Sequence, residues 1–128
     1  MPEYPLLFEA GLLIVYARLK GPRGSRLLRM ALDTGATTTM IPPKAALAIG
    51  INPARSSVLR ETLTASGKEL IPLIAVPELR IFERTLRRVS VACHELPSES
   101  PVDGLLGLDL LTRIHAVLDL RKRSLRLS

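Results

Sequence analysis

The sequence predicts a mostly β, barrel-like domain with two short helices, and three features of its 128 residues support this. Several short runs alternate apolar and polar residues or are rich in β-branched residues, as strands are. Turn signals that contain Gly and Pro separate these runs at short intervals. The length suits one domain, so residues 1–128 are expected to form a single core.

The first two predicted strands form a hairpin that ends on an acid. The runs are "GLLIVYARLK" and "SRLLRMALD", and the Gly/Pro cluster "GPRG" between them has the length of a hairpin loop. The second strand therefore delivers Asp33. Beyond it, "TTTMI" has the β-branched composition of a strand. A short helix is expected at about residues 44–49, because Pro42 and Pro43 stand near its start and Gly50 stands where a C-terminal cap belongs.

The middle of the chain predicts a second hairpin and then two further strands. "SVLRETLTA" and "KELIPLIAV" flank the turn signal Ser66-Gly67. After them, "ELRIF" and "RRVSVACHEL" alternate apolar and polar residues, and "PSESP" interrupts the pattern as an exposed loop.

The C-terminal part predicts a strand, a helix and a closing hairpin. "DGLLGLDLLTRIHAVLDL" begins as a short apolar strand and passes Gly107. Asp109 stands where it could cap a helix that carries Leu110, Leu111 and Ile114 on one apolar side. "AVLDL" and "SLRLS" around "RKR" complete the chain.

Composition excludes several classes of site. The single cysteine, Cys93, cannot form an internal disulfide, and with His94 and His115 it makes no zinc-binding pattern. The two histidines are expected at a surface and on a helix face, not in a Ser-His-Asp system. No metal and no cofactor are therefore expected.

Location and partners are also constrained. No apolar run is long enough to span a bilayer, and no basic segment precedes the first apolar stretch as in a signal peptide, so we expect a cytoplasmic protein without a membrane partner. The net charge of +6 could attract nucleic acid. With two Phe and two Tyr, however, the chain offers few base-stacking groups, and solvated turns explain the arginines better.

The stretch "ALDTGATTTMIP" places a lone carboxylate, Asp33, at the end of a strand. Asp commonly starts a turn there, because its side chain accepts a hydrogen bond from its own backbone two residues on. The alternative is that Asp33 is a chemical reagent.

Three motifs in one order favour the reagent. "LDTGAT" at 32–37, a Ser-Gly hairpin in mid-chain, and "DGLLGLDLL" at 103–111 followed by "VLDLRKRSLRL" resemble the retropepsin-like aspartic proteases. The similarity covers roughly residues 11–127. The terminal segment is especially similar to small bacterial relatives and to the protease domain of the DNA-damage-inducible ubiquitin-shuttle proteins. The resemblance implies a retropepsin-like β-barrel with one short helix after the catalytic loop and one C-terminal helix.

The resemblance also implies roles for the loop that follows the strand. Asp33 would be the catalytic carboxylate, Thr34 would bond across to its symmetry mate, and Gly35 and Ala36 would complete the active-site loop. Peptide hydrolysis without a metal needs a base to activate water and an acid to protonate the amide. Two facing carboxylates that share a proton supply both.

Two further segments receive roles from the same resemblance. Ala65, Ser66 and Gly67 would form the tip of a flap that covers a peptide substrate, or else an ordinary surface hairpin. The segment Leu105, Leu106, Gly107 would pack behind the catalytic loop as scaffold.

One Asp-Thr-Gly copy in a chain of this size predicts half a site per chain, so two chains must meet at Asp33 about a two-fold axis. The terminal segments "PLLFEA" and "SLRLS" are candidates for pairing at that interface. The predicted function is a homodimeric aspartic endopeptidase that acts on peptides or unfolded protein segments. A peptide-binding or dimerisation module with little catalysis is the alternative, and a nucleic-acid-binding β domain is a third hypothesis supported by charge alone.

Overall fold

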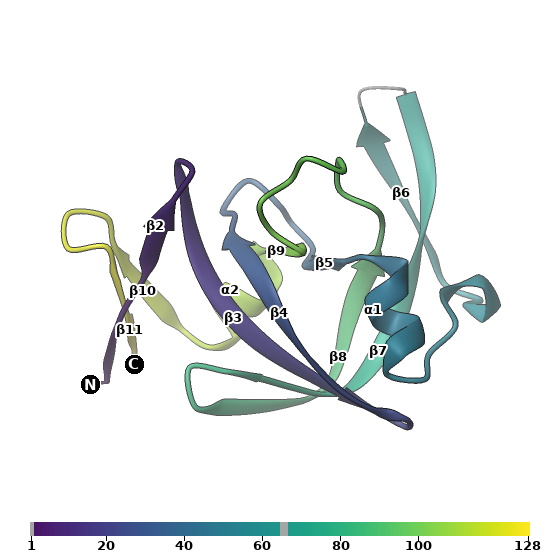
Figure 1. Cartoon of the computed structure of the whole chain (residues 1–128), viewed down its shortest axis with the longest axis horizontal. Coiled ribbons are helices and arrows are strands. Elements are labelled where there is room, and N and C mark those ends of the chain that lie inside the picture. Colours follow the sequence, from purple (N-terminus) through teal and green to yellow (C-terminus); the bar gives the residue numbers. More distant parts are fainter. Residues whose placement is uncertain (1, 65–66) are drawn as a thin grey trace.

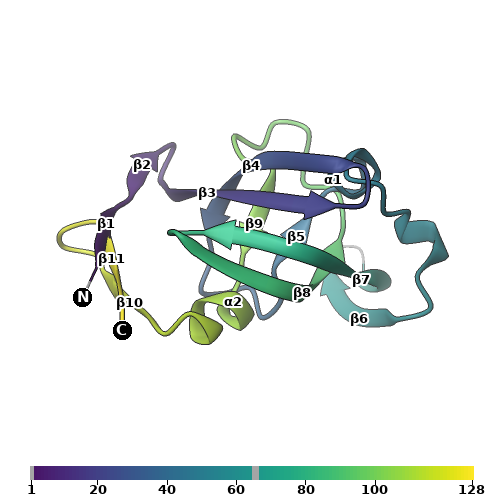
Figure 2. The ribbon, with the colours of Figure 1, turned by 90° about the horizontal axis from the view of Figure 1, so that it is seen from below.

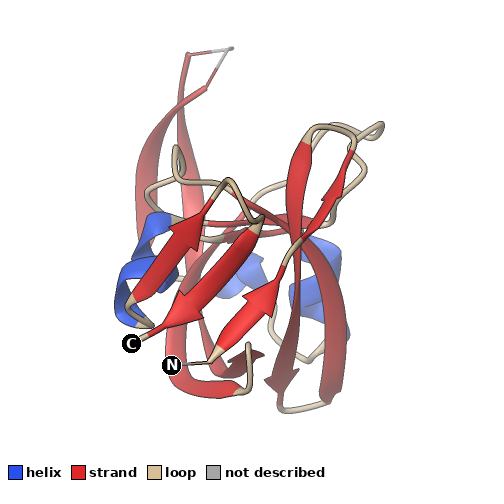
Figure 3. Ribbon diagram, turned by 90° about the vertical axis from the view of Figure 1, so that its left-hand side faces the viewer, coloured by secondary structure: helices blue, strands red, loops and turns tan. Residues whose placement is uncertain are grey.

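The computed structural model of the chain describes residues 2–64 and 67–128, and most of them lie in strands (Figure 3). The strands are β1 (Glu3–Pro5), β2 (Leu7–Glu9), β3 (Leu12–Gly21), β4 (Gly24–Leu32), β5 (Met40–Ile41), β6 (Leu59–Thr64), β7 (Gly67–Ile81), β8 (Arg84–Cys93), β9 (Gly104–Leu106), β10 (Ala116–Asp119) and β11 (Ser124–Leu127). The helices are α1 (Pro43–Ala48), the 3₁₀ turn η1 (Pro53–Arg55) and α2 (Leu108–Arg113). The expected mostly β fold with two short helices is confirmed.

The larger sheet has the order β2-β3-β4-β9-β5-β8-β7-β6, and an additional pairing of β3 with β7 closes six of these strands into a ring. Most neighbours are antiparallel, but β4 pairs with β9 and β5 pairs with β8 in parallel. The parallel pairing aligns Leu32 with Leu106. Two segments more than seventy residues apart therefore end side by side, at the point where Asp33 begins its loop (Figure 1).

Alternation of apolar and polar residues explains why β3 folds as a strand in this ring. Ala17 and Leu19 are buried, whereas Tyr16, Arg18 and Lys20 are exposed, which is the two-residue period of a strand with one face in a core. The predicted β3–β4 hairpin around "GPRG" is present, with Gly21 opposite Gly24.

The core joins the larger sheet to the rest of the chain. One cluster of buried side chains contains Met30 of β4, Leu79 of β7, Leu106 of β9 and Leu125 of β11. The three-stranded sheet β1-β11-β10 thus packs its apolar side against the same core as the ring, next to which it lies in Figure 2.

The segment expected to form two strands, "KELIPLIAV" and "ELRIF", is instead the single strand β7. Pro77 lies between the two runs, and the register continues unchanged across it, from Val76 opposite Val89 to Glu78 opposite Arg87. Pro77 has no N–H to donate, and the skipped partner, Arg88, takes a positive φ of 52°. The strand therefore tolerates the proline as a local interruption of its hydrogen bonding.

Both predicted helices are present, with one correction. The helix expected at 44–49 is α1, one residue earlier at each end. In α2 the N-cap is Gly107, not Asp109, which lies in the first turn and directs its carboxylate toward another element. None of the helices in the described part of the chain is long and apolar enough to cross a membrane.

The terminal segments pair within the chain. β11 lies between β1 and β10, so both of its edges are occupied, and β2 pairs with β3. Within one chain, β11 therefore has no unpaired edge and β2 is paired along one edge, and the pairing of "PLLFEA" and "SLRLS" with a second chain stays a prediction. The outer edges of the small sheet belong to β1 and β10.

Candidate active site

Asp33 stands directly after β4, where the paired strands β4 and β9 end. Its backbone N–H donates to Leu106 O at 2.9 Å, which continues the pairing of the two strands by one residue. Its side chain is half-buried, and Oδ1 accepts a hydrogen bond from Gly35 N at 2.8 Å. Asp33 thus forms the local turn that its sequence context allows, and this turn fixes the direction of its carboxylate.

Gly35 and Ala36 complete the loop and also make close contacts. A Cβ at Gly35 would lie 3.1 Å from Asp33 Oδ1, so a side chain there would crowd the carboxylate. Ala36 N donates to Asp33 O at 3.1 Å, and Ala36 O accepts from Leu108 N at 2.8 Å. The loop is therefore bonded both to itself and to the start of α2.

A network of hydrogen bonds holds the loop from behind. Thr39 is fully buried, and both its N–H, at 3.0 Å, and its hydroxyl, at 2.7 Å, donate to the Asp109 carboxylate. The Thr39 hydroxyl oxygen in turn accepts from Gly107 N at 3.0 Å. A Cβ at Gly107 would lie 2.8 Å from Ala36 O, so only glycine lets the two segments approach this closely.

The predicted scaffold segment has residues on two sides of the Asp33 loop. It consists of Leu105, Leu106 and Gly107. Leu106 and Gly107 are buried behind it, as scaffold would be. Leu105, the alternate residue of β9, is half-buried and lines the pocket that contains Asp33. This division follows from the alternation of side chains along a strand.

The pocket next to Asp33 has a volume of about 300 Å³ and is a groove between the loop and β6. Met40, Ala92 and Leu105 supply apolar walls, and Arg60 and Thr62 line it from β6. The β6–β7 hairpin, which projects at the upper right of Figure 1, therefore covers one side of the groove.

The expected flap tip is described in part. Gly67 begins β7 opposite Thr64 and has a φ of 114°, a conformation that favours glycine. Ala65 and Ser66 lie outside the described residues.

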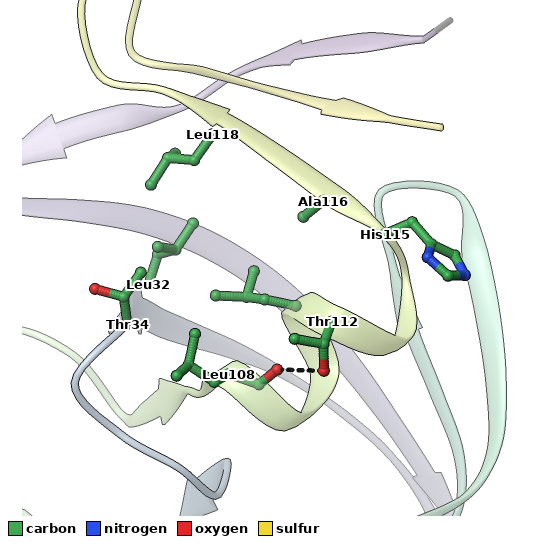
Figure 4. A pocket seen from close by; sticks show the side chains of 8 residues that line it. Leu32, Thr34, Leu108, Thr112, His115, Ala116 and Leu118 are labelled. Carbon is green, nitrogen blue, oxygen red and sulfur yellow. Dashed lines mark hydrogen bonds between the residues drawn. The ribbon is translucent and has the colours of Figure 1, made fainter.

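A second pocket, of about 180 Å³, lies on the other side of the Asp33 loop. Figure 4 shows Leu32, Thr34 and Leu108 around it, with Ala116 and Leu118 of β10 opposite. We call this surface the Thr34 face, and its remaining members are Leu111, Thr112 and His115. Leu108 is 39% exposed, and the exposed Thr34 side chain makes no hydrogen bond within residues 2–64 and 67–128.

The two histidines lie in different surroundings. His94 follows β8, and its Nε2 lies 2.8 Å from Glu69 Oε2 on β7, a contact that raises the pKa of His94 above 6.5. His115 follows α2 in a left-handed conformation and borders the Thr34 face. Burial raises the pKa of the Cys93 thiol to about 11. Across the described residues, no group of three His, Cys, Asp or Glu side chains is placed to hold a metal ion.

Sequence reasoning did not find Thr39, Asp109 or Arg60 as parts of this site. Asp109 accepts from Thr39 across a separation of 70 residues, and Arg60 NH1 donates to Thr38 Oγ1 across 22. The apolar residues around Asp109 signalled a helix start but carried no information on its partner.

The comparisons agree with the fold and the motifs. A family model described as aspartyl protease matches residues 15–110, so the chain belongs to the aspartyl protease family. No curated protein sequence gives a match.

Two solved structures extend the likeness to nearly the whole chain. A retropepsin-like aspartic protease from Rickettsia conorii is similar at 20% identity and a TM-score of 0.72, over 97% of this chain and 88% of that one. The retroviral protease-like domain of Ddi1 from Leishmania major is similar at 18% identity and a TM-score of 0.63, over 91% of this chain and 88% of that one. The chain therefore has a retropepsin-like fold, and the resemblance inferred from the motifs is confirmed.

Proposed function

We propose that the chain is a homodimeric aspartic endopeptidase in which Asp33 and the Asp33 of a second copy activate the water that attacks a peptide bond. One carboxylate, ionised, takes a proton from the water, and the other, protonated, stabilises and protonates the reacting amide. Each copy of the domain, residues 1–128, contributes half of the site. The substrate is an extended peptide or an unfolded protein segment in a cytoplasmic setting.

The observation that carries the proposal is that Asp33 lines a groove between its own loop and β6. Its carboxylate direction is fixed by Gly35 N, and its loop is bonded to β9 and α2. A hydrogen-bonded acid of fixed direction that lines a groove supports a role in acid–base catalysis. Gly35 and Ala36 then shape the loop on which the reacting amide would lie.

The Thr34 face supports a second copy as the source of the other acid. Leucines surround an exposed threonine that has no hydrogen-bond partner within the described ranges. A two-fold axis next to this face would bring Thr34 against its own copy and bury Leu108 and Leu118. The same operation would place the two Asp33 carboxylates opposite each other.

The β6–β7 hairpin would act as the flap. Arg60 and Thr62 already line the groove from β6, so a peptide in the groove would lie beneath this hairpin. Ala65, Ser66 and Gly67 at its tip would give the substrate backbone hydrogen bonds and limit the entry of water.

The test is digestion of a proteome-derived peptide library by the wild type and by Asp33→Asn, from about pH 3 to about pH 8. The variant keeps the shape of the side chain and loses its proton, so we expect cleavage to fall roughly a thousandfold or more. Wild-type activity should show a bell-shaped profile on the acid side of neutrality, because facing carboxylates titrate in two separate steps.

Two results would contradict the proposal. Equal cleavage by Asp33→Asn and the wild type would show that Asp33 is not the reagent. Peptide binding without cleavage by either protein would favour the alternative, a peptide-binding or dimerisation module on the same fold.

A further inference from the structure

Arg60 is a cation that lines the groove and lies outside the Asp-Thr-Gly loop. It lies on β6 opposite Ile71, and the alternation of the strand places Thr62 on the same face. This face lines the pocket that contains Asp33, together with Met40 and Leu105. The Arg60 side chain is exposed and lines the groove.

The neighbouring acids of the hairpin are already paired elsewhere. Glu61, on the outer face, lies 3.3 Å from Lys68 Nζ, and Glu69 lies 2.8 Å from His94. Within the described ranges, Arg60 makes no ion pair with any carboxylate, Asp33 included. Its Nη1 donates a hydrogen bond to Thr38 Oγ1, which belongs to the loop on the opposite wall.

The Thr38 contact orients the guanidinium without neutralising it. Arginine has five N–H donors in a planar fork, and one donor to a hydroxyl leaves a bidentate edge available for a carboxylate. Met40, Ala92 and Leu105 supply apolar walls, Thr37, Thr38 and Thr62 add hydroxyl groups, and the Asp33 carboxylate lines the same pocket. A pocket with apolar walls and one oriented guanidinium matches a side chain that has a short aliphatic stem and an acidic end.

We propose that Arg60 makes this groove selective for peptides with a glutamate or aspartate side chain in the pocket formed with Thr38, Met40 and Leu105. This inference rests on the proposed protease function for its cleavage step, but the binding preference follows from the groove alone. A two-fold dimer contains two copies of Arg60, one on each side of the scissile bond. The acidic preference should therefore occur at two positions, placed symmetrically about the cleavage point.

The cleavage test uses decapeptide pools in which one position at a time holds Glu or Gln and the other positions are mixed. For the wild type we expect kcat/KM to favour Glu about tenfold at the two symmetric positions and not elsewhere, as suits a charge-assisted bond at a partly exposed site. Arg60→Gln should abolish the preference, and Arg60→Glu should replace it by a preference for Lys. Arg121→Gln, which removes an exposed arginine in the β10–β11 turn, is the matched control and should behave as the wild type.

The binding test separates this inference from the proposed function. Immobilised Asp33→Asn chain, with or without Arg60→Gln, is exposed to the same Glu and Gln pools, and the retained peptides are identified by mass spectrometry. Enrichment of Glu that disappears with Arg60→Gln supports the inference even if the wild type cleaves nothing. Enrichment should also fade below about pH 4, where the glutamate becomes neutral. Equal retention of Glu and Gln pools, retention of neither, or a Glu preference that survives Arg60→Gln would overturn it.

Discussion

The two sides of the Asp33 loop differ in how completely this chain satisfies them. Behind the loop, Thr39 is fully buried and donates twice to Asp109, and its hydroxyl accepts from Gly107. On the other side, Thr34 is exposed and has no hydrogen bond within the described ranges, and Leu108 is 39% exposed next to a pocket. One chain therefore fixes the position of its own acid and leaves an apolar surface beside it unoccupied. This difference supports the proposal that the loop is completed by a second copy.

The largest effect on assembly and activity is expected from placing a positive charge on the Thr34 face. Leu108→Arg would put an unpaired cation into the proposed interface, where burial without a partner costs several kcal/mol, so the chain should become monomeric and inactive. Its thermal unfolding should change little, because this side chain is partly exposed in the single chain. Sedimentation velocity and peptide cleavage measure the two outcomes.

The matched control is Leu47→Arg on α1. Leu47 is also exposed, at 55%, and it lines none of the pockets described above. It should remain dimeric and active. A dimeric, fully active Leu108→Arg would remove the Thr34 face from the interface.

A smaller effect, on stability, is expected from a change behind the Asp33 loop. Asp109→Ala would leave the buried N–H and hydroxyl of Thr39 without their acceptor, and should lower the free energy of unfolding by about 2–4 kcal/mol. Asp109→Asn keeps one acceptor oxygen and should lose less. Urea denaturation measures the free energy of unfolding of both variants. Peptide cleavage should also fall, because the Asp33 loop would be held less firmly.

Asp119→Ala provides the comparison for Asp109. Asp119 accepts one hydrogen bond, from Lys122 N at 3.0 Å in the β10–β11 turn. Asp119→Ala should therefore lower the free energy of unfolding by about 1 kcal/mol or less. Equal losses for the two aspartates would show that the Asp109 network does not hold the Asp33 loop.

The smallest effect concerns the contact between His94 and Glu69 of the β6–β7 hairpin. The hydrogen bond to Glu69 raises the pKa of His94, so the folded state binds a proton more tightly than the unfolded state does. The stabilisation from this contact is complete below pH 6.5 and is lost as pH rises through the raised value. The wild type should therefore lose stability between about pH 6 and about pH 8, and Glu69→Gln should lose less.

Glu61→Gln is the control for this pH dependence. It removes an ion pair with Lys68 on the outer face of the same hairpin, and neither partner in that pair is a histidine. The stability of Glu61→Gln should change with pH as steeply as that of the wild type. A Glu69→Gln slope identical to the wild type would show that the His94 contact has no effect on folding.

Local signals in the sequence predicted much of the fold. "GPRG" and Ser66-Gly67 marked two hairpins, and the Pro residues before α1 marked its start, because turns and helix ends depend on residues that are adjacent in the chain. The division of β7 into two strands, on either side of Pro77, was wrong. A proline inside a strand usually indicates a break, but here the neighbouring pairs of β7 and β8 maintain the register across it.

Contacts between distant segments were beyond local reasoning. Asp-Thr-Gly identified the loop, but neither the Asp109–Thr39 network nor the Arg60–Thr38 contact has a spacing rule in the sequence. The in-chain pairing of β11 on both edges was likewise missed, because strand partners depend on the whole topology. These contacts decide how the acid is held and what the groove offers a peptide.

The most direct test of the central claim is a subunit-mixing measurement with the wild type and Asp33→Asn. If one chain contributes one acid, random exchange of equal amounts leaves about a quarter of dimers with both acids, and activity per wild-type chain falls to about half. Activity per chain should also fall on dilution, because dissociation separates the two carboxylates. Mass spectrometry or fluorescence transfer verifies that exchange has occurred. Activity that simply tracks the amount of wild-type chain after verified exchange would contradict the account, because the second carboxylate would then come from the same chain.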